Sequence, residues 1–443
     1  MKTGILLLLL AIHVRIAAGQ TMPGKNADST SSPWTLEQCL EYATIHNHNL
    51  LAGNLSAQAA AQDRKAAAAK LLPEINIKGD INNYWKIPVQ VFPGELVNQP
   101  AGTFVPVRMG TPWMGSYGAD ADLPLLDVQT WQRVKLARLQ QQAAQSEYRS
   151  LQKTLLKNVR IAWYLAQQLQ TYAAITAQLY ENYRHIHELI TLQLTKGFTD
   201  KIAFNQSAVL LKNREQECLK ANATLQQSYL DLKFWMGYPL DTPLPLAPAA
   251  ELPPLAIAAF NDQQLPGYES EQWKVQLARQ DYQSALAARY PDLHIKGTWE
   301  QLGFGNKSNF ITRSPWFTVG FAGVQLSMPL SLSSMIYHPR SRKAQWEAAR
   351  QQLENYSNEQ EKKYQQEKIL LSQAAKNMAL QQENIRLATE NEQLSTLKIN
   401  KGIIDMIQLK EVQKDLYDAQ QQLNEARMDF YKHYTEINYL QNK

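Results

Sequence analysis

The stretch Ala-Lys-Leu-Leu-Pro-Glu-Ile-Asn-Ile-Lys-Gly at residues 69–79 returns at residues 287–297 as Ala-Ala-Arg-Tyr-Pro-Asp-Leu-His-Ile-Lys-Gly. In both copies a helical pattern stops at a proline, which disfavours a helical residue before it and offers no N–H for a helical bond. Apolar and polar residues then alternate, as in a strand with one apolar and one polar face. Two copies of this junction indicate an internal duplication.

Further landmarks repeat in the same order. Leu-Pro-Leu at 123–125 returns as Met-Pro-Leu at 328–330, and the turn Thr-Lys-Gly-Phe-Thr-Asp at 195–200 returns as Asn-Lys-Gly-Ile-Ile-Asp at 400–405. We therefore expect repeat 1 over residues 20–236 and repeat 2 over residues 267–443, each ordered helix, strand, strand, long helix, turn, helix. A proline-rich connector over residues 237–266 should join them.

Residues 1–19 are predicted to be a secretory signal peptide, with a charged Lys2, a short apolar run and small residues before Gln20. Neither Cys39 nor Cys218 follows this signal, so no N-terminal lipid anchor is expected. Two cysteines are too few for a disulfide scaffold, and we expect buried free thiols.

Helical periodicity dominates the chain. Thr35 and Gln38 form a capping-box pattern, and the first helix should break near residues 46–49. Apolar residues then step by three or four from Val128 to Leu194, a helix of about 100 Å at ~1.5 Å per residue. Asp200 should cap a returning helix to about Trp235. The second repeat predicts helices from about residue 340 to 399 and from 405 to 439.

Four strands are expected, two in each repeat. The fourth changes phase near Ala322 and Gly323, which predicts a bulge or a glycine bend. Irregular loops are expected over residues 88–112 and 305–315. Four tryptophans lie at the loop ends of the strands: Trp85, Trp113, Trp299 and Trp316.

No motif for catalysis, a metal or a cofactor is present. The chain contains no H-E-x-x-H, no paired CxxC and no P-loop, and His185 and His187 diverge on a helix. The formal charge is only +5 without a long basic run, so nucleic acid is not an expected partner. We therefore expect a protein that is not an enzyme, with no cofactor and no metal site.

Strands of about ten residues with one apolar face have the length of tilted membrane-spanning strands, and tryptophans at their ends suit an interfacial aromatic girdle. Four strands cannot close a barrel, and an open edge in lipid leaves backbone groups unpaired, so several chains would have to pool their strands. Three chains would give twelve. A water-soluble sheet packed on helices remains the alternative at this point.

The chain resembles the TolC-like outer-membrane efflux family. The resemblance rests on residues 36–43, on the junctions at Pro73 and Pro291, on the exits at Pro124 and Pro329, and on the motifs at 401–407 and 416–423. It implies a mainly helical fold with membrane strands: a coiled-coil barrel beneath a trimeric twelve-strand β-barrel. It also implies the outer membrane of a Gram-negative bacterium, and a periplasmic adaptor and an inner-membrane transporter as partners.

The resemblance also suggests functional residues. The family's adaptor-contact turns correspond to Thr195-Lys196-Gly197 and Asn400-Lys401-Gly402. Acidic residues that ring the family's closed aperture correspond to Gln408 and Glu411, of which only Glu411 is acidic. Asp405 is a nearby alternative acid that also suits a helix cap.

A competing function is that of a periplasmic adaptor, a long helical hairpin that binds without conducting. The strand pairs recur twice between helices, which favours the channel. Drug efflux, metal efflux and protein secretion stay open as its task.

Overall fold

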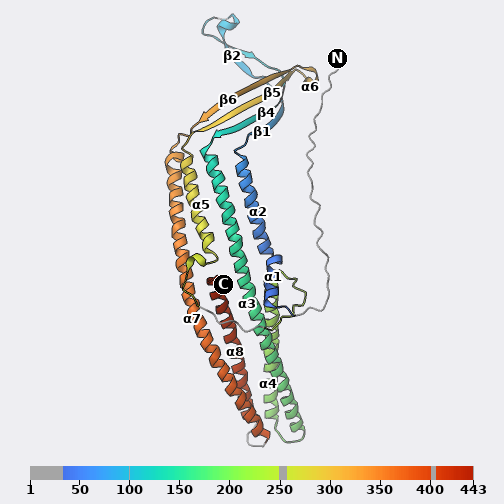
Figure 1. Ribbon diagram of the computed structural model, residues 1–443. Helices are drawn as coiled ribbons and strands as arrows, with labels where there is room; N and C mark the ends of the chain where they lie inside the picture. Colours follow the sequence, from blue (N-terminus) through green and yellow to red (C-terminus); the bar gives the residue numbers. More distant parts are fainter. Residues whose placement is uncertain (1–32, 99, 249–256, 401–405, 443) are drawn as a thin grey trace.

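The computed structural model describes residues 33–98, 100–248, 257–400 and 406–442, so the predicted signal peptide lies outside the described residues. A sheet lies at one end of an elongated molecule, and helices run from it to two hairpin ends far away (Figure 1). The helices are α1 (Leu36–His46), α2 (His48–Ala69), α3 (Val128–Thr195), α4 (Lys201–Met236), α5 (Tyr268–Ala287), α6 (Phe310–Arg313), α7 (His338–Asn400) and α8 (Met406–Leu440). The strands are β1 (Glu74–Asn83), β2 (Val89–Pro93), β3 (Phe104–Arg108), β4 (Trp113–Leu126), β5 (Asp292–Gly305) and β6 (Trp316–Ser327). Short turns are η1 (Gly94–Val97), η2 (Asp262–Gln264) and the π-helical η3 (Ser333–Tyr337).

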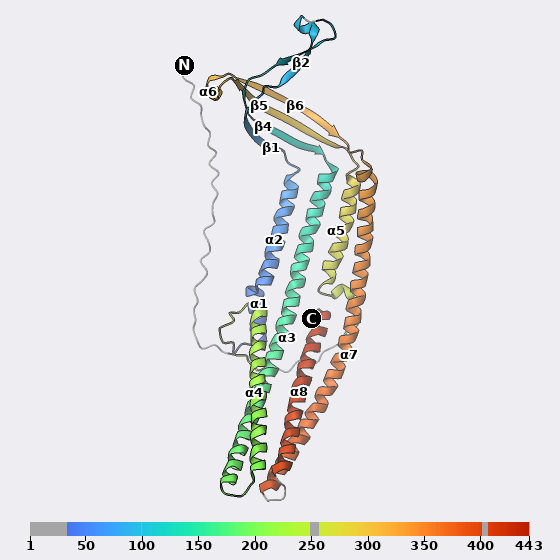
Figure 2. The same cartoon turned by 180° about the vertical axis from the view of Figure 1, so that it is seen from behind.

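Two long helices set the length of the molecule. Helix α3 has 68 residues and α7 has 63, and each runs from the sheet to the far end. In both views α2 lies above α4 beside α3, and α5 lies above α8 beside α7 (Figure 2). Helix α3 is therefore accompanied along its length by α2 and α4, with α1 where these two meet, and α7 is accompanied by α5 and α8.

Side-chain caps fix the helix boundaries. Thr35 and Gln38 form the predicted capping box, with Gln38 N donating to Thr35 Oγ1 over 3.3 Å. The predicted break near residue 47 is confirmed, because Asn47 ends α1 and its Oδ1 accepts from Leu50 N at the start of α2. Asp200 caps α4 through Ala203 N, as predicted.

The four long strands form one antiparallel sheet in the order β1-β4-β5-β6. Within the described residues, β1 and β6 are its edges. The bulge predicted as one possibility near Ala322 and Gly323 is absent, because β6 pairs with β5 in continuous register. The strand keeps its register, but its apolar side chains lie on one face at Val319 and Phe321 and on the other face at Val324 and Leu326. The register shift lies in β4 between Pro124 and Leu126.

The loop predicted over residues 88–112 contains regular structure. Strands β2 and β3 pair from Val89↔Arg108 to Pro93↔Phe104 and project beyond the main sheet (Figure 1). Phe104 and Val91 on this hairpin are exposed. The hairpin of β2 and β3 is a short second sheet at the end of the molecule opposite the helical hairpin ends.

Two hydrophobic clusters lie where the helices meet end to end. The first includes Cys39, Val159 and Met236, and the second includes Tyr364 and Ile437. Burial, helped by the nearby Glu37 charge, raises the pKa of the Cys39 thiol to about 12. Both cysteines are free, Cys39 buried as expected and Cys218 only half-buried.

No helix in the described part of the chain combines the length and apolarity needed to cross a bilayer.

Candidate functional site

Across β1, β4 and β5, one face of the main sheet is polar and internally paired. The register places Lys78 of β1, Asp120 of β4 and Glu300 of β5 side by side, with Lys78 Nζ 3.2 Å from Asp120 and 3.9 Å from Glu300. Thr298 Oγ1 donates to Asp120 over 2.9 Å. The same face carries the pairs Ser116–Asp80, His294–Asp122 and Lys296–Asp122. This ladder of charges keeps the polar residues of three strands mutually satisfied.

The opposite face is apolar and uncovered. Ile77 of β1 is 88% exposed, and Val324 and Leu326 of β6 are 67% and 68% exposed. Soluble monomeric proteins rarely expose a continuous apolar surface of this kind. Such a surface indicates a contact with lipid or with another protein.

Aromatic side chains gather on this apolar face near the loop end of the sheet. The ring of Tyr117 lies 5.0 Å from that of Trp316 and 6.2 Å from that of Trp299. Phe310 of α6 lies 6.3 Å from both Trp113 and Trp316. Three of the four predicted girdle tryptophans therefore belong to one aromatic cluster. Amphipathic rings of this kind suit a membrane–water interface.

Trp85 stands apart from that cluster. It follows the end of β1 and is 96% exposed. The sequence pattern missed two members of the cluster. Alternation in β4 gives no sign that Tyr117 joins an aromatic cluster. Phe310 reaches the sheet from a helix of four residues that no periodicity reveals.

Glycines make room for these rings. A Cβ on Gly115 would lie 3.0 Å from the Phe310 ring, and one on Gly303 would lie 3.0 Å from the Trp316 ring. These separations are tighter than ordinary van der Waals contact, so the absence of a side chain lets the aromatic groups lie flat on the sheet.

The first hairpin end is a tight turn at Thr195, Lys196 and Gly197. Gly197 has φ +78°, in the left-handed region, and Phe198 N donates to the Gln193 carbonyl over 2.9 Å. The side chains of Thr195, Lys196 and Phe198 are exposed. The turn therefore presents an open surface at the far end of the molecule.

The second hairpin end lies beside the first (Figures 1 and 2). Asn400 ends α7, whereas Lys401, Gly402 and Asp405 lie outside the described residues. Gln408 and Glu411 lie in the first turns of α8, and both are exposed. The first turn, the end of α7 at Asn400 and the start of α8 with Glu411 therefore lie at the same end of the molecule.

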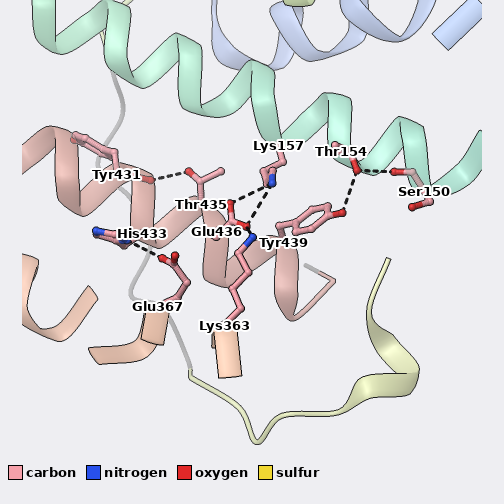
Figure 3. A network of polar contacts seen from close by, with 10 residues as sticks. All are labelled: Ser150, Thr154, Lys157, Lys363, Glu367, Tyr431, His433, Thr435, Glu436 and Tyr439. Carbon is pink, nitrogen blue, oxygen red and sulfur yellow. Dashed lines mark hydrogen bonds and ion pairs between the residues drawn. The ribbon is translucent and has the colours of Figure 1, made fainter. Parts of the chain in front are cut away.

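An ion cluster with a buried carboxylate joins the two halves of the chain (Figure 3). Glu436 of α8 lies between Lys157 of α3, at 3.2 Å, and Lys363 of α7. Burial alone would raise the pKa of Glu436, but the hydrogen bonds and charges of the two lysines hold it below its ordinary value. Nearby, His433 Nδ1 lies 2.7 Å from Glu367 Oε2.

A second contact joins the halves closer to the hairpin ends. The Arg214 guanidinium of α4 lies 5.2 Å from the Tyr183 ring of α3 and 4.6 Å from the Tyr417 ring of α8. Tyr417 and Tyr172 are linked through their hydroxyls at 3.1 Å. Burial and this hydrogen bond raise the pKa of Tyr417, so its hydroxyl stays neutral.

The described residues contain no group of three or more acidic, histidine or cysteine side chains arranged to hold a metal ion. The Nδ1 atom of His187 lies 2.7 Å from Ser207 Oγ, at hydrogen-bond distance.

Comparison with known proteins agrees with this architecture. No curated protein matches the sequence significantly. Among solved structures, the CmeC outer membrane channel of Campylobacter jejuni shares 12% identity at a TM-score of 0.74, covering 91% of this chain and 85% of that one. VceC from Vibrio cholerae shares 15% identity at 0.69, covering 92% and 96%. The open state of the MtrE outer membrane channel of Neisseria gonorrhoeae shares 13% identity at 0.71, covering 92% and 88%. At these identities the likeness shows the fold.

The family assignment comes from the sequence profile described as outer membrane efflux protein. It matches residues 40–238 and 267–439, which is most of the chain and includes both hairpins and all four long strands. The chain therefore belongs to the outer membrane efflux protein family, whose members lie in the outer membrane of Gram-negative bacteria and extend into the periplasm.

Proposed function

We propose that the protein is the exit duct of a tripartite efflux or secretion system, which conducts cargo from a periplasmic adaptor and an inner-membrane pump to the exterior. The observation that carries this proposal is the four-stranded sheet with one apolar face, one polar face and two open edges. Only a closed barrel satisfies strand edges in lipid. Three copies, each contributing β1, β4, β5 and β6, supply twelve strands.

The adjacent hairpin ends support the same proposal. The turn at Thr195, Lys196 and Gly197 lies at the opposite end of the molecule from the sheet, beside the end of α7 at Asn400. In a trimer, six such ends would surround the axis. We assign them, together with Lys401 and Gly402, to adaptor contact, and Glu411, with Gln408 or Asp405, to the lining of the aperture.

Oligomeric state gives the first test. The full-length protein, extracted in mild detergent, should have the mass of three chains and should form ion-conducting pores in planar bilayers. A folded monomer under the same conditions contradicts the proposal. So does a stable trimer that never conducts.

A matched pair of variants tests whether the sheet lies in lipid. Ile77→Lys places a charge on the uncovered apolar face of β1, where a lysine in the bilayer core costs about 2–4 kcal/mol per chain. Outer-membrane insertion and conductance should be lost. Asn76→Lys changes the neighbouring residue on the polar face and should insert normally.

The pair also separates the channel from a water-soluble sheet. Ile77 is 88% exposed within the chain, so a soluble protein would tolerate or prefer lysine there. Equal recovery of both variants in the soluble periplasmic fraction would overturn the membrane assignment.

A further inference from the structure

A polar pocket lies where the sheet passes into the helices. It has a volume of about 340 Å³ and is formed within one chain by the first turns of α3, the last turns of α5 and the segment from η3 into α7. Its polar lining is Gln129, Arg133, Asp281, Ser284, Ser334, His338 and Arg342. Neither the charged face of the sheet nor the hairpin ends include these residues.

No acidic side chain of the pocket forms an ion pair with its two arginines among the described residues. Against the effect of burial, the charge of Arg133 helps to lower the pKa of Asp127, but among the described residues Arg133 forms no hydrogen bond and no close ion pair. Arg342 donates to Gln345 Oε1 over 2.8 Å. No ion pair joins Asp281 to either arginine within the same part of the chain. Arg133 and Arg342 are both exposed, line the same cavity and keep donors that no carboxylate uses within the described residues. Two such guanidinium groups match the oxygens of a phosphate, which arginine binds with two parallel hydrogen bonds.

The position of the pocket indicates where the phosphate comes from. The segment that supplies Ser334 and His338 also carries exposed apolar side chains, with Leu330 at 74%, Leu332 at 68% and Tyr337 at 64% exposure. Apolar and aromatic residues beside basic ones, at the end of strands with a lipid-facing surface, are typical of a headgroup region. This step rests on the proposed placement of the sheet in the membrane.

We propose that this pocket binds the headgroup phosphate of a phospholipid in the periplasmic leaflet of the outer membrane. Arg133 and Arg342 hold the phosphate oxygens. The hydroxyls of Ser284 and Ser334 already donate to the carbonyls of Gln280 and Ser331, so the arginines supply the hydrogen bonds to the phosphate. The carboxylate of Asp281 lies in the same cavity and attracts an ammonium group, so phosphatidylethanolamine binds better than phosphatidylglycerol. The lipid anchors the junction of sheet and helices at a fixed depth.

Native mass spectrometry of the delipidated full-length protein in mild detergent tests this site. The probes are phosphatidylethanolamine, phosphatidylglycerol and a diacylglycerol with the same acyl chains but no phosphate. The double variant R133Q/R342Q should bind both phospholipids about tenfold more weakly or worse, because charge-assisted hydrogen bonds are lost. The control R138Q/R350Q removes exposed arginines of α3 and α7 outside the pocket and should bind normally.

Two outcomes overturn the proposal: phospholipid binding equal in the pocket variant and the control, or diacylglycerol binding as strong as that of the phospholipids. D281N should remove the preference for phosphatidylethanolamine without removing binding. A parallel titration with free phosphoethanolamine distinguishes the source. If the soluble compound binds as tightly as the lipid and is lost in R133Q/R342Q, the phosphate site stands but its ligand is a solute.

These measurements do not depend on conductance. A failed channel assay with intact lipid binding would therefore count against the duct alone, and a conducting R133Q/R342Q protein with normal lipid binding would count against the pocket alone.

Discussion

At the scale of single residues, the stability of the helical region depends on Glu436. Its side chain is only 11% exposed and lies between two lysines from different helices, of which Lys157 is 16% and Lys363 is 41% exposed. Removing one member of such a cluster leaves the remaining charges buried without a partner, which lowers the stability of the fold. Replacing the whole cluster with apolar residues would lower it less.

We expect Glu436→Gln to lower the free energy of unfolding by about 2–3 kcal/mol, since Lys157 loses its charged partner in a mostly buried position. The thermal unfolding midpoint of the helical circular-dichroism signal in detergent measures this loss. Glu383→Gln on α7 removes an exposed pair with Arg386 and should leave the midpoint unchanged. Equal effects of the two substitutions would contradict a special role for Glu436.

The effect of pH on this variant has a definite sign. The folded pKa of Glu436 is depressed from its ordinary value of 4.5, so its stabilisation is fully present above that value and is lost as pH falls through the folded pKa. The midpoints of the parent protein and Glu436→Gln should therefore differ at neutral pH and converge under acid conditions.

Among the secondary-structure elements, the sequence predicted the long helices, because their apolar residues recur regularly over many turns. The helices α3, α4, α7 and α8 carry repeating apolar positions, and their capping residues mark the boundaries. The hairpin β2–β3 was missed because Pro93 and Pro106 interrupt its short strands and resemble loop residues. The phase change in β6 was misread because alternation alone cannot distinguish a slipped register from apolar residues on both faces.

The candidate site was predictable to a similar extent. The tryptophans were found because strand ends are visible in sequence. The contacts that place Phe310 against them are not, since they depend on how a loop folds back onto the sheet. The partners of Glu436 were equally hidden, because Lys157, Lys363 and Glu436 lie on three helices whose rotation about their axes is fixed only by packing.

The sheet itself offers a sharp test through its glycines. A Cβ on Gly118 of β4 would lie 2.2 Å from the Trp299 carbonyl oxygen and 2.8 Å from Glu300 Cα, both backbone atoms of β5. Gly118→Ala should therefore separate these strands and abolish heat-resistant oligomers on gels. At Gly79 of β1 the nearest atom would be 3.6 Å away, so Gly79→Ala should assemble like the parent. Normal oligomers from both would show that β4 and β5 are not so close.

A pair of substitutions at Gly197 tests whether the shape of its turn matters for function. Its φ of +78° suits glycine or asparagine but not a β-branched residue, and a Cβ would meet no atom within 4 Å. Gly197→Val should keep the protein at normal levels in the membrane but abolish export, measured as tolerance if the cargo is toxic, whereas Gly197→Asn should preserve both. Full tolerance with Gly197→Val would argue that the shape of this turn is not read by an adaptor.

At the scale of the whole molecule, both hairpins end together while the sheet lies at the other extreme (Figure 2). Around a threefold axis, Glu411 would then occur three times near a common constriction. Carboxylates in a narrow pore attract cations and repel one another. Glu411 is exposed within one chain, as a pore-lining side chain must be.

Glu411→Lys should reduce cation selectivity and remove block by multivalent cations in planar bilayers, because three positive charges replace three negative ones. Asp429→Lys, an exposed acid farther along α8, provides the control and should conduct like the parent. If the two variants behave alike, Glu411 lies away from the constriction, and Asp405 is the next residue to substitute.

The open edges of β1 and β6 have a genetic consequence. A chain that cannot complete its share of the wall spoils the copies with which it assembles, since each edge must be paired by a neighbour. If normal and defective chains are made equally and mix at random, roughly one assembly in eight would contain only normal copies in a closed threefold ring. Alleles whose products still associate but leave one edge unpaired should therefore behave as dominant over a normal copy in the same cell.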